Sequence, residues 1–251
     1  MKLLSKKIFF IIFLSFAFQL YGQNKLYVEY DVRIYDSTIG ILIADKTSSF
    51  YEEGLTTNKN KESMGKNMFS SGDFTHSIVY QNIKKPEINY IQTEYNDEDY
   101  FIKDSISTMK WELSSSEKTI EIQGYKCNEA KLNFRGSTYV AYYTNQIPTT
   151  FGPWKFKGLP GLILKVESQE NPTIYWRATK IIYPYTTDKK LSVDLNKFKL
   201  SLKDYIKYED SEDDAQSRAL AAKSYGAIYV QIPDDMRREK SRERKYEWET
   251  W

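Results

Sequence analysis

The chain has 251 residues, enough for one domain with a sizeable core, and it carries 36 basic and 34 acidic side chains for a formal net charge of +2. This near-neutral balance excludes the strongly basic surface of DNA- and RNA-binding proteins, so no nucleic-acid partner is expected. A single cysteine, Cys127, excludes an internal disulfide bond, and an aromatic content of 16% favours β-strands, whose half-buried faces accommodate large rings.

The first 22 residues have the pattern of a cleaved signal peptide. Lys2, Lys6 and Lys7 precede an apolar run at 8–20, and Gly22 is a small residue suited to cleavage. The run is shorter than the about 20 apolar residues of a membrane-spanning helix, although a retained N-terminal anchor is the alternative. No cysteine follows directly after this run, so a lipoprotein is not expected. We therefore expect a mature chain without a transmembrane span, located in the periplasm or associated with the outer membrane.

Alternation of apolar and polar residues predicts strands throughout residues 23–200. The clearest strand is at 26–34, where every second residue is apolar. Further strands are expected at 48–51, 77–83, 88–92, 100–103, 109–113, 120–134, 138–144, 162–166 and 174–178. Short turns between successive strands favour an antiparallel meander. We expect a mainly β domain with a single, strongly curved antiparallel sheet or half-barrel.

Three turn signals predict how these strands connect. Gly124 lies where the apolar phase changes, which favours a β-bulge. The sequence Arg135-Gly136-Ser137 is typical of a hairpin turn. Pro160 and Gly161 suit the central positions of a type II turn, because proline fixes φ at about −65° and glycine accepts the positive φ that follows.

Residues 201–251 differ from the β-rich part. Acidic residues gather at 209–214, an alanine-rich stretch at 214–224 predicts a short helix, and 237–245 holds six basic residues before an aromatic end at Tyr246, Trp248 and Trp251. We interpret the acidic run as a solvated helix face and the tail as a frayed end. The alternative is a basic, aromatic tail that docks on another envelope component.

A series of motifs resembles a known family. The hexapeptide Gly158-Leu159-Pro160-Gly161-Leu162-Ile163 spells the name of the GLPGLI family, exported envelope proteins of Bacteroidota-type bacteria with no assigned function. Gly124-Tyr125-Lys126-Cys127, Ala141-Tyr142-Tyr143-Thr144 and Gly152-Pro153 precede it in the family's order. The resemblance covers residues 25–185 and implies no catalytic residue or cofactor. Family members are often encoded beside TonB-dependent receptors, which implies an accessory role with an outer-membrane receptor or another envelope protein as partner.

The titratable residues form no catalytic or metal-binding pattern. His76 is the only histidine, so zinc sites built on two or three histidines are excluded. A Cys-His or Ser-His-Asp arrangement has only His76 and Cys127 to use, and we interpret both as structural. The acidic run at 209–214 lacks the glycine and the spacing of a calcium loop. No catalytic, cofactor-binding or metal-binding residue is predicted.

Two roles are open for the turn at 158–163. It either fixes the register of the sheet or, with Tyr143, Trp154, Phe156 and Leu159, presents a rigid apolar surface to a ligand or partner. The first function hypothesis is a non-enzymatic envelope binding protein linked to TonB-dependent transport. The alternatives are a carrier that holds a lipid-like, apolar ligand on the concave face of the sheet, and a hydrolase that uses paired carboxylates.

Overall fold

The computed structural model describes residues 25–34, 37–55, 76–85, 87–93, 99–106, 109–115, 119–223, 238 and 241–249. The predicted signal peptide, the end of the tail at Trp251 and the side chain of His76 lie outside this described part.

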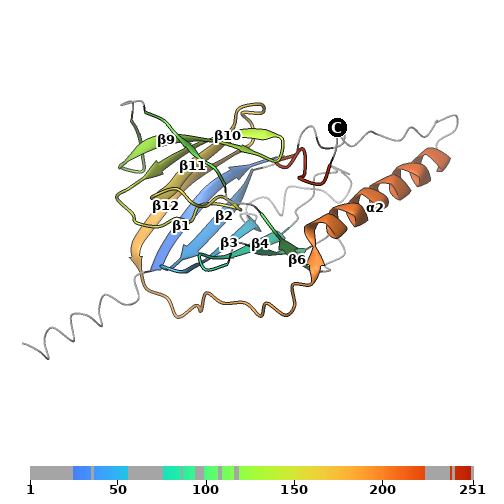
Figure 1. Cartoon of the computed structure of the whole chain (residues 1–251), viewed down its shortest axis with the longest axis horizontal. Coiled ribbons are helices and arrows are strands. Elements are labelled where there is room, and N and C mark those ends of the chain that lie inside the picture. The colour runs from blue at the N-terminus through green and yellow to red at the C-terminus, as the bar shows by residue number, and fades with distance from the viewer. Residues whose placement is uncertain are drawn as a thin grey trace, which may run out of the picture.

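About half of the described residues belong to one large sheet, and one helix lies near the C-terminus (Figure 1). The elements are β1 (Lys25–Arg33), β2 (Ser37–Ala44), β3 (Ser48–Leu55), β4 (His76–Asn82), β5 (Ile88–Thr93), β6 (Asp99–Asp104), β7 (Glu112–Leu113), β8 (Ile120–Ile122), β9 (Tyr125–Phe134), β10 (Ser137–Thr144), β11 (Leu162–Ser168), β12 (Tyr175–Tyr185), β13 (Leu200–Ser201) and α2 (Leu202–Lys223). The mainly β prediction is therefore confirmed.

The sheet consists of two meanders that run outward from β1. The strand order is β13-β6-β5-β4-β3-β2-β1-β12-β11-β10-β9-β7, and β8 pairs with β9. All these pairs are antiparallel except β13 with β6, which are parallel. The predicted antiparallel meander is thus confirmed in part, because the sheet is mixed. Its edge strands β13 and β7 do not pair with each other, so the sheet is not closed into a barrel.

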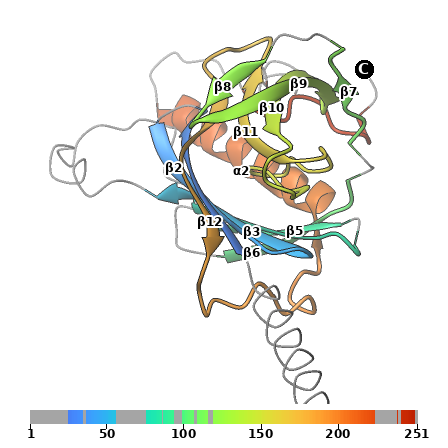
Figure 2. The same cartoon turned by 90° about the vertical axis from the view of Figure 1, so that its left-hand side faces the viewer.

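The sheet is bent, and irregular pairing accompanies the bend. β9 and β10 lie across from β3 and β6 in Figure 2, with β12 and β1 between them in the strand order. Register shifts occur between β1 and β12, between β2 and β3, and between β10 and β11. An irregular residue in one strand increases the local twist, which helps a sheet to turn on itself.

Two hairpins use the same turn chemistry. Arg135 and Gly136, between β9 and β10, have φ of 47° and 78°, and Gln123 and Gly124, between β8 and β9, have φ of 52° and 78°. Two consecutive positive φ values define the type I′ turn, whose twist matches that of the flanking strands. The hairpin at Arg135-Gly136 is confirmed. The predicted bulge at Gly124 is wrong, because the chain reverses there.

The hexapeptide bends the chain at 159–161 and enters β11 at Leu162, but not through the predicted type II turn. Gly158, and not Gly161, has the positive φ, at 98°. Gly161 is required for a different reason. A Cβ at this position would lie 2.6 Å from the carbonyl carbon of Thr144, so only glycine lets the start of β11 approach the end of β10.

α2 is longer than predicted and starts with a side-chain cap. The amide of Asp204 donates a hydrogen bond to Ser201 Oγ at 3.1 Å, which satisfies one of the free amides at the helix start. Leu202, Tyr205 and Ile206 join the hydrophobic core of the sheet. Among the described residues, no helix is both long enough and apolar enough to cross a membrane.

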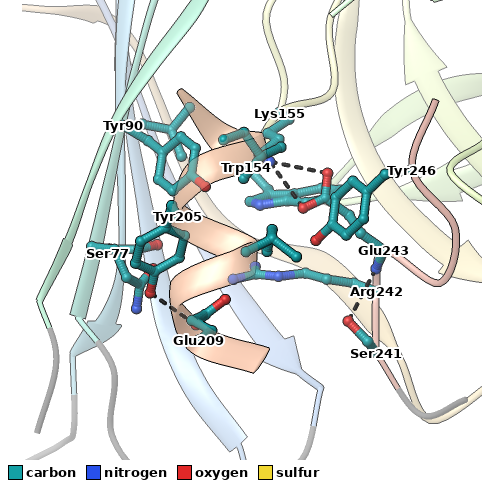
Figure 3. Close-up of a pocket in the computed structure, with 14 residues that line it drawn as sticks. Ser77, Tyr90, Trp154, Lys155, Tyr205, Glu209, Ser241, Arg242, Glu243 and Tyr246 are labelled. Atoms are coloured by element: carbon teal, nitrogen blue, oxygen red, sulfur yellow. Dashed lines mark hydrogen bonds and ion pairs between the residues drawn. The ribbon is translucent and has the colours of Figure 1, made fainter. Parts of the chain in front are cut away.

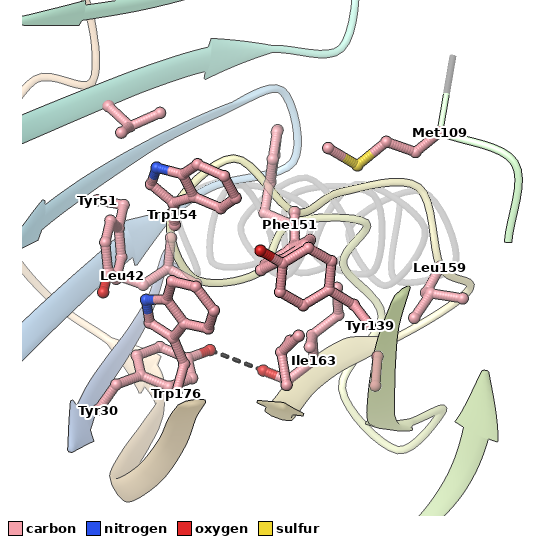
Figure 4. Packing of buried hydrophobic residues seen from close by; sticks show 14 of the residues in the cluster. Tyr30, Leu42, Tyr51, Met109, Tyr139, Phe151, Trp154, Leu159, Ile163 and Trp176 are labelled. Carbon is pink, nitrogen blue, oxygen red and sulfur yellow. Dashed lines mark hydrogen bonds between the residues drawn. The ribbon is translucent and has the colours of Figure 1, made fainter. Parts of the chain in front are cut away.

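Aromatic rings fill the inner side of the bend (Figure 4). Trp154 and Trp176 stack with ring centroids 5.6 Å apart, and Phe156 meets the rings of Trp176 and Tyr139 edge to face at 5.3 and 4.9 Å. The connection between β10 and β11, residues 145–161, supplies Trp154 and Phe156 to this packing. The inner face of the sheet is therefore occupied at this place by the protein's own side chains.

Candidate functional site

A cavity of about 190 Å³ lies where four segments meet: the strand pair β4–β5, the turn at 153–156, the start of α2, and residues 241–246 (Figure 3). We call residues 241–249 the C-terminal segment. The lining combines aromatic rings, charges of both signs and a few aliphatic side chains: Ser77, Val79, Tyr90, Gln92, Trp154, Lys155, Leu202, Tyr205, Ile206, Glu209, Ser241, Arg242, Glu243 and Tyr246.

Four buried charges, which we call the charge cluster, lie beside this cavity: Asp104, Arg135, Lys155 and Glu243. The Arg135 guanidinium donates to both oxygens of Asp104, at 2.9 and 2.7 Å. Lys155 Nζ donates to Asp104 at 2.8 Å and to the two Glu243 oxygens at 3.0 and 2.9 Å, and Arg135 also donates to Glu243. Each cation thus contacts both carboxylates, and the four charges cancel.

The charge cluster comes from four places in the fold. Asp104 ends β6, Arg135 occupies the β9–β10 turn, Lys155 follows Trp154 in the turn at 153–156, and Glu243 belongs to the C-terminal segment. Burial alone would raise the pKa of Asp104, but Lys155 and Arg135 outweigh burial, and the pKa is lowered. Asp104 therefore stays ionised and holds the two cations in place.

A fifth buried charge, Glu53 of β3, pairs with Arg242, the residue before Glu243 in the C-terminal segment. The sheet supplies neutral donors to this carboxylate, namely the Tyr51 hydroxyl at 3.0 Å and Trp176 Nε1 at 3.4 Å. The guanidinium of Arg242 completes the set and lies 4.9 Å from the centroid of the Trp154 ring. Burial first, and then the Glu53 carboxylate, raise the pKa of Tyr51, so its hydroxyl remains a donor.

The C-terminal segment packs on the domain, so the interpretation as a frayed end is wrong for residues 241–249. Glu243 and Tyr246 are buried, and the amides of Arg244 and Lys245 donate to the carbonyl of Arg135 at 2.8 and 3.0 Å. The tail thus binds its own domain. Docking of the tail on another envelope component stays a prediction.

The acidic run at 209–214 is only in part the solvated helix face that we expected. Glu212 and Asp213 are exposed. Glu209, however, accepts a hydrogen bond from the Tyr205 hydroxyl at 2.8 Å, and Asp210 pairs with the buried Arg238 at 2.5 Å. The first contact lies within α2 beside the cavity, and the second connects α2 to the tail.

The predicted apolar surface lies in the core. Tyr143, Trp154, Phe156 and Leu159 are at most 4% exposed, because their rings and aliphatic groups pack against the sheet. They offer no apolar surface to solvent. Of the four, Trp154 lines the cavity. A role for any of them in binding stays a prediction.

The hexapeptide and Cys127 occupy structural positions. Leu159, Gly161, Leu162 and Ile163 are buried, whereas Gly158 and Pro160 are exposed. Cys127 is buried in β9, and burial raises the pKa of its thiol to about 11, so the thiol is protonated at neutral pH. Within the described ranges, no group of three or more histidine, cysteine or acidic side chains is arranged to hold a metal ion.

Sequence reasoning missed the charge cluster and Glu53. One signal was available, because Lys155 lies between Trp154 and Phe156 in a motif that otherwise suggests apolar packing. A charge in such a place needs buried partners. Nothing in the sequence around Lys155 indicates which residues these partners are.

Comparison with known proteins gives a family match over one part of the chain. Residues 133–165 match the model of a family described as "Protein of unknown function (Porph_ging)". The matched stretch contains Arg135, Lys155 and the hexapeptide. No curated protein matches the chain.

Two solved structures of PNGF-II, in space groups C2 and P21, are similar to this chain at 19% sequence identity, with TM-scores of 0.47 and 0.46. The match covers 74% of this chain and 32% of each of those chains. The chain thus spans about a third of the length of the structures that it matches.

Proposed function

We propose that the chain is an exported, non-enzymatic binding protein of the cell envelope that holds a partner or ligand at the cavity beside the charge cluster. One observation carries the proposal: four segments that are distant in the sequence bring aromatic rings and charges of both signs to one cavity of about 190 Å³. A concave site with a few converging polar groups is typical of recognition.

The proposal includes membership of the GLPGLI family and an accessory role beside a TonB-dependent outer-membrane receptor. The ordered motifs from Gly124 to Ile163 support the family. The match to Porph_ging over 133–165 coincides with the most distinctive of these motifs. The pattern of residues 1–22 supports export to the periplasm or the outer membrane.

The lining of the cavity favours a polar partner over a lipid-like ligand. An apolar molecule in the cavity would lie against the charged side chains of Lys155, Arg242, Glu209 and Glu243 and could form a hydrogen bond with none of them. The inner face of the sheet near Trp154 is already filled by stacked rings.

The carboxylates of the charge cluster do not favour a hydrolase. A general acid of a glycosidase-type pair needs a raised pKa, so that it is protonated at the working pH. The pKa of Asp104 is instead lowered, and both Asp104 and Glu243 are held by Lys155 and Arg135. The ion-paired arrangement of these carboxylates therefore agrees better with a binding site than with a site of proton transfer.

Filling the cavity tests the proposal. Gln92 lines the cavity, and Ile91 is its neighbour on the opposite face of β5. We expect native mass spectra of the protein purified from its own envelope to show a retained partner or ligand for the wild type and for Ile91→Trp, and its loss for Gln92→Trp. A bare wild-type protein, or retention by folded Gln92→Trp, would contradict the proposal.

A further inference from the structure

The C-terminal segment contacts the domain as a peptide ligand would. Its two adjacent residues Arg242 and Glu243 enter two sites of opposite charge, which are built by residues far away in the sequence. Arg242 pairs with Glu53, 189 positions earlier. Glu243 pairs with Lys155 and Arg135, 88 and 108 positions earlier.

Both sites are built by the domain itself. Asp104 holds the guanidinium of Arg135 through two hydrogen bonds and also holds Lys155 Nζ. The Tyr51 hydroxyl and Trp176 Nε1 donate to Glu53. These contacts do not involve the C-terminal segment, so they keep the receiving groups oriented whichever peptide enters. Such preorganisation lowers the cost of binding.

Backbone contacts hold the segment in a way that does not depend on its side chains. The Tyr139 hydroxyl donates to the carbonyl of Arg242, and the carbonyl of Arg135 accepts the amides of Arg244 and Lys245. Peptide-binding domains divide recognition in the same way, with main-chain hydrogen bonds for affinity and pockets for the choice of side chain.

The charges make this contact selective. A buried ion pair adds little net stability compared with apolar packing, whereas a mismatched charge in the same place is costly. The segment also leaves the cavity of about 190 Å³ between itself, α2 and the sheet, so it does not fill the available space. A segment with only a structural role would gain more from apolar side chains that fill this space.

We infer that Glu53, Lys155 and Arg135 form a recognition site for an extended segment of a partner protein. This segment carries arginine followed directly by glutamate. In the structure, Arg242-Glu243 of the same chain occupies the site in cis. The inference rests on the proposed function and names the class of partner. Glu53 receives the arginine, Lys155 and Arg135 receive the glutamate, and Trp154 contacts the guanidinium. A partner must compete with the protein's own segment, so the cis contact restricts binding to well-matched sequences.

A labelled nine-residue peptide with the sequence of residues 241–249 tests the inference on the full chain by fluorescence anisotropy. The control peptide has the same composition but exchanges the order of its arginine and glutamate at the positions of 242 and 243. We expect the double variant Arg242→Ala/Glu243→Ala to bind the native peptide at least tenfold more tightly than the wild-type chain does. We also expect it to bind the native peptide at least tenfold more tightly than the control peptide.

Equal affinity for the two peptides, or no binding to a folded variant, would overturn the inference. If circular dichroism shows that the double variant is unfolded, the same criteria apply to Glu243→Gln, which preserves the size of the side chain. A wild-type dimer that the peptide dissociates, measured by analytical ultracentrifugation, would assign the site to a second copy of the chain instead of a partner protein.

The two proposals can fail separately. A peptide preference without any retained partner in the native mass spectra would refute the proposed function and leave the chemistry of the site intact. A partner that is retained by the wild type and lost in Gln92→Trp, without any peptide preference, would refute this inference alone.

Discussion

The charge cluster shows how burial determines the contribution of a single charged residue to the stability of the fold. The side chains of Asp104, Arg135 and Lys155 are at most 2% exposed, so water does not screen their interactions. An intact buried cluster is worth little more than apolar packing, because desolvation offsets the attraction between the charges. Removal of one member, however, leaves the opposite charges without compensation. Loss of a single charge from the cluster is therefore costly.

Lys155→Ala should lower the free energy of unfolding by about 3–5 kcal/mol, the usual cost of breaking a buried ion pair. Lys180, which pairs with Glu29 at 3.0 Å and has a side chain 55% exposed, is the matched control. Lys180→Ala should cost at most about 1 kcal/mol, because solvent screens a surface pair. Urea denaturation measures both values. Similar losses for the two variants would contradict the account of the cluster.

Among the elements, the connection between β10 and β11 behaves as part of the core. Residues 145–161 lie in the bend of the sheet, and their backbone is held by side chains from other elements. Gln81 Nε2 donates to the carbonyl of Trp154 at 3.0 Å, and Trp111 Nε1 donates to the carbonyl of Lys157 at 2.8 Å. These bonds satisfy backbone groups that a buried loop would otherwise leave unpaired. The hexapeptide ends this packed connection and leads the chain into β11.

Gly161→Ala should therefore disturb the packing of β10 against β11. The added Cβ meets the backbone of Thr144, which cannot move aside as a side chain can. We expect a loss of about 3 kcal/mol or more in the free energy of unfolding, at the upper end for overpacking. Gly124→Ala, whose Cβ would meet nothing within 4 Å, should cost only the about 1–2 kcal/mol of a left-handed alanine. Guanidinium denaturation compares them, and equal costs would refute the steric role of Gly161.

At the scale of the whole molecule, local patterns in the sequence predict the strands but not how distant parts meet. β1 and β10 follow from their alternation. β2 was not predicted, because Ile41, Leu42 and Ile43 are consecutive and show no period of two. α2 begins at Leu202 and not at residue 214, since its first turns gain stability from the core. The ion pairs of the charge cluster join residues that are 31 to 108 positions apart, so only the three-dimensional structure reveals them.

The charge cluster connects β6, the β9–β10 turn, the turn at 153–156 and the C-terminal segment, so its ionisation affects the stability of the whole molecule. Burial opposes ionisation of Asp104, but Lys155 and Arg135 outweigh burial and lower its pKa. A carboxyl group with a lowered pKa contributes stability that is fully present above the pKa of the unfolded chain, about 3.9 for Asp, and is lost as the pH falls through the folded-state pKa.

Asp104→Asn should consequently be less stable than the wild type at neutral pH, and this difference should shrink once the pH falls below about 4. The expected slope is at most about 1.4 kcal/mol per pH unit, the value for one proton taken up on unfolding. Urea denaturation of both proteins at several pH values between neutral and about 3 measures this difference. Other carboxyl groups titrate in both proteins and cancel in the comparison. A difference that stays constant down to about pH 3 would mean that the ionisation of Asp104 does not contribute to the stability of the fold.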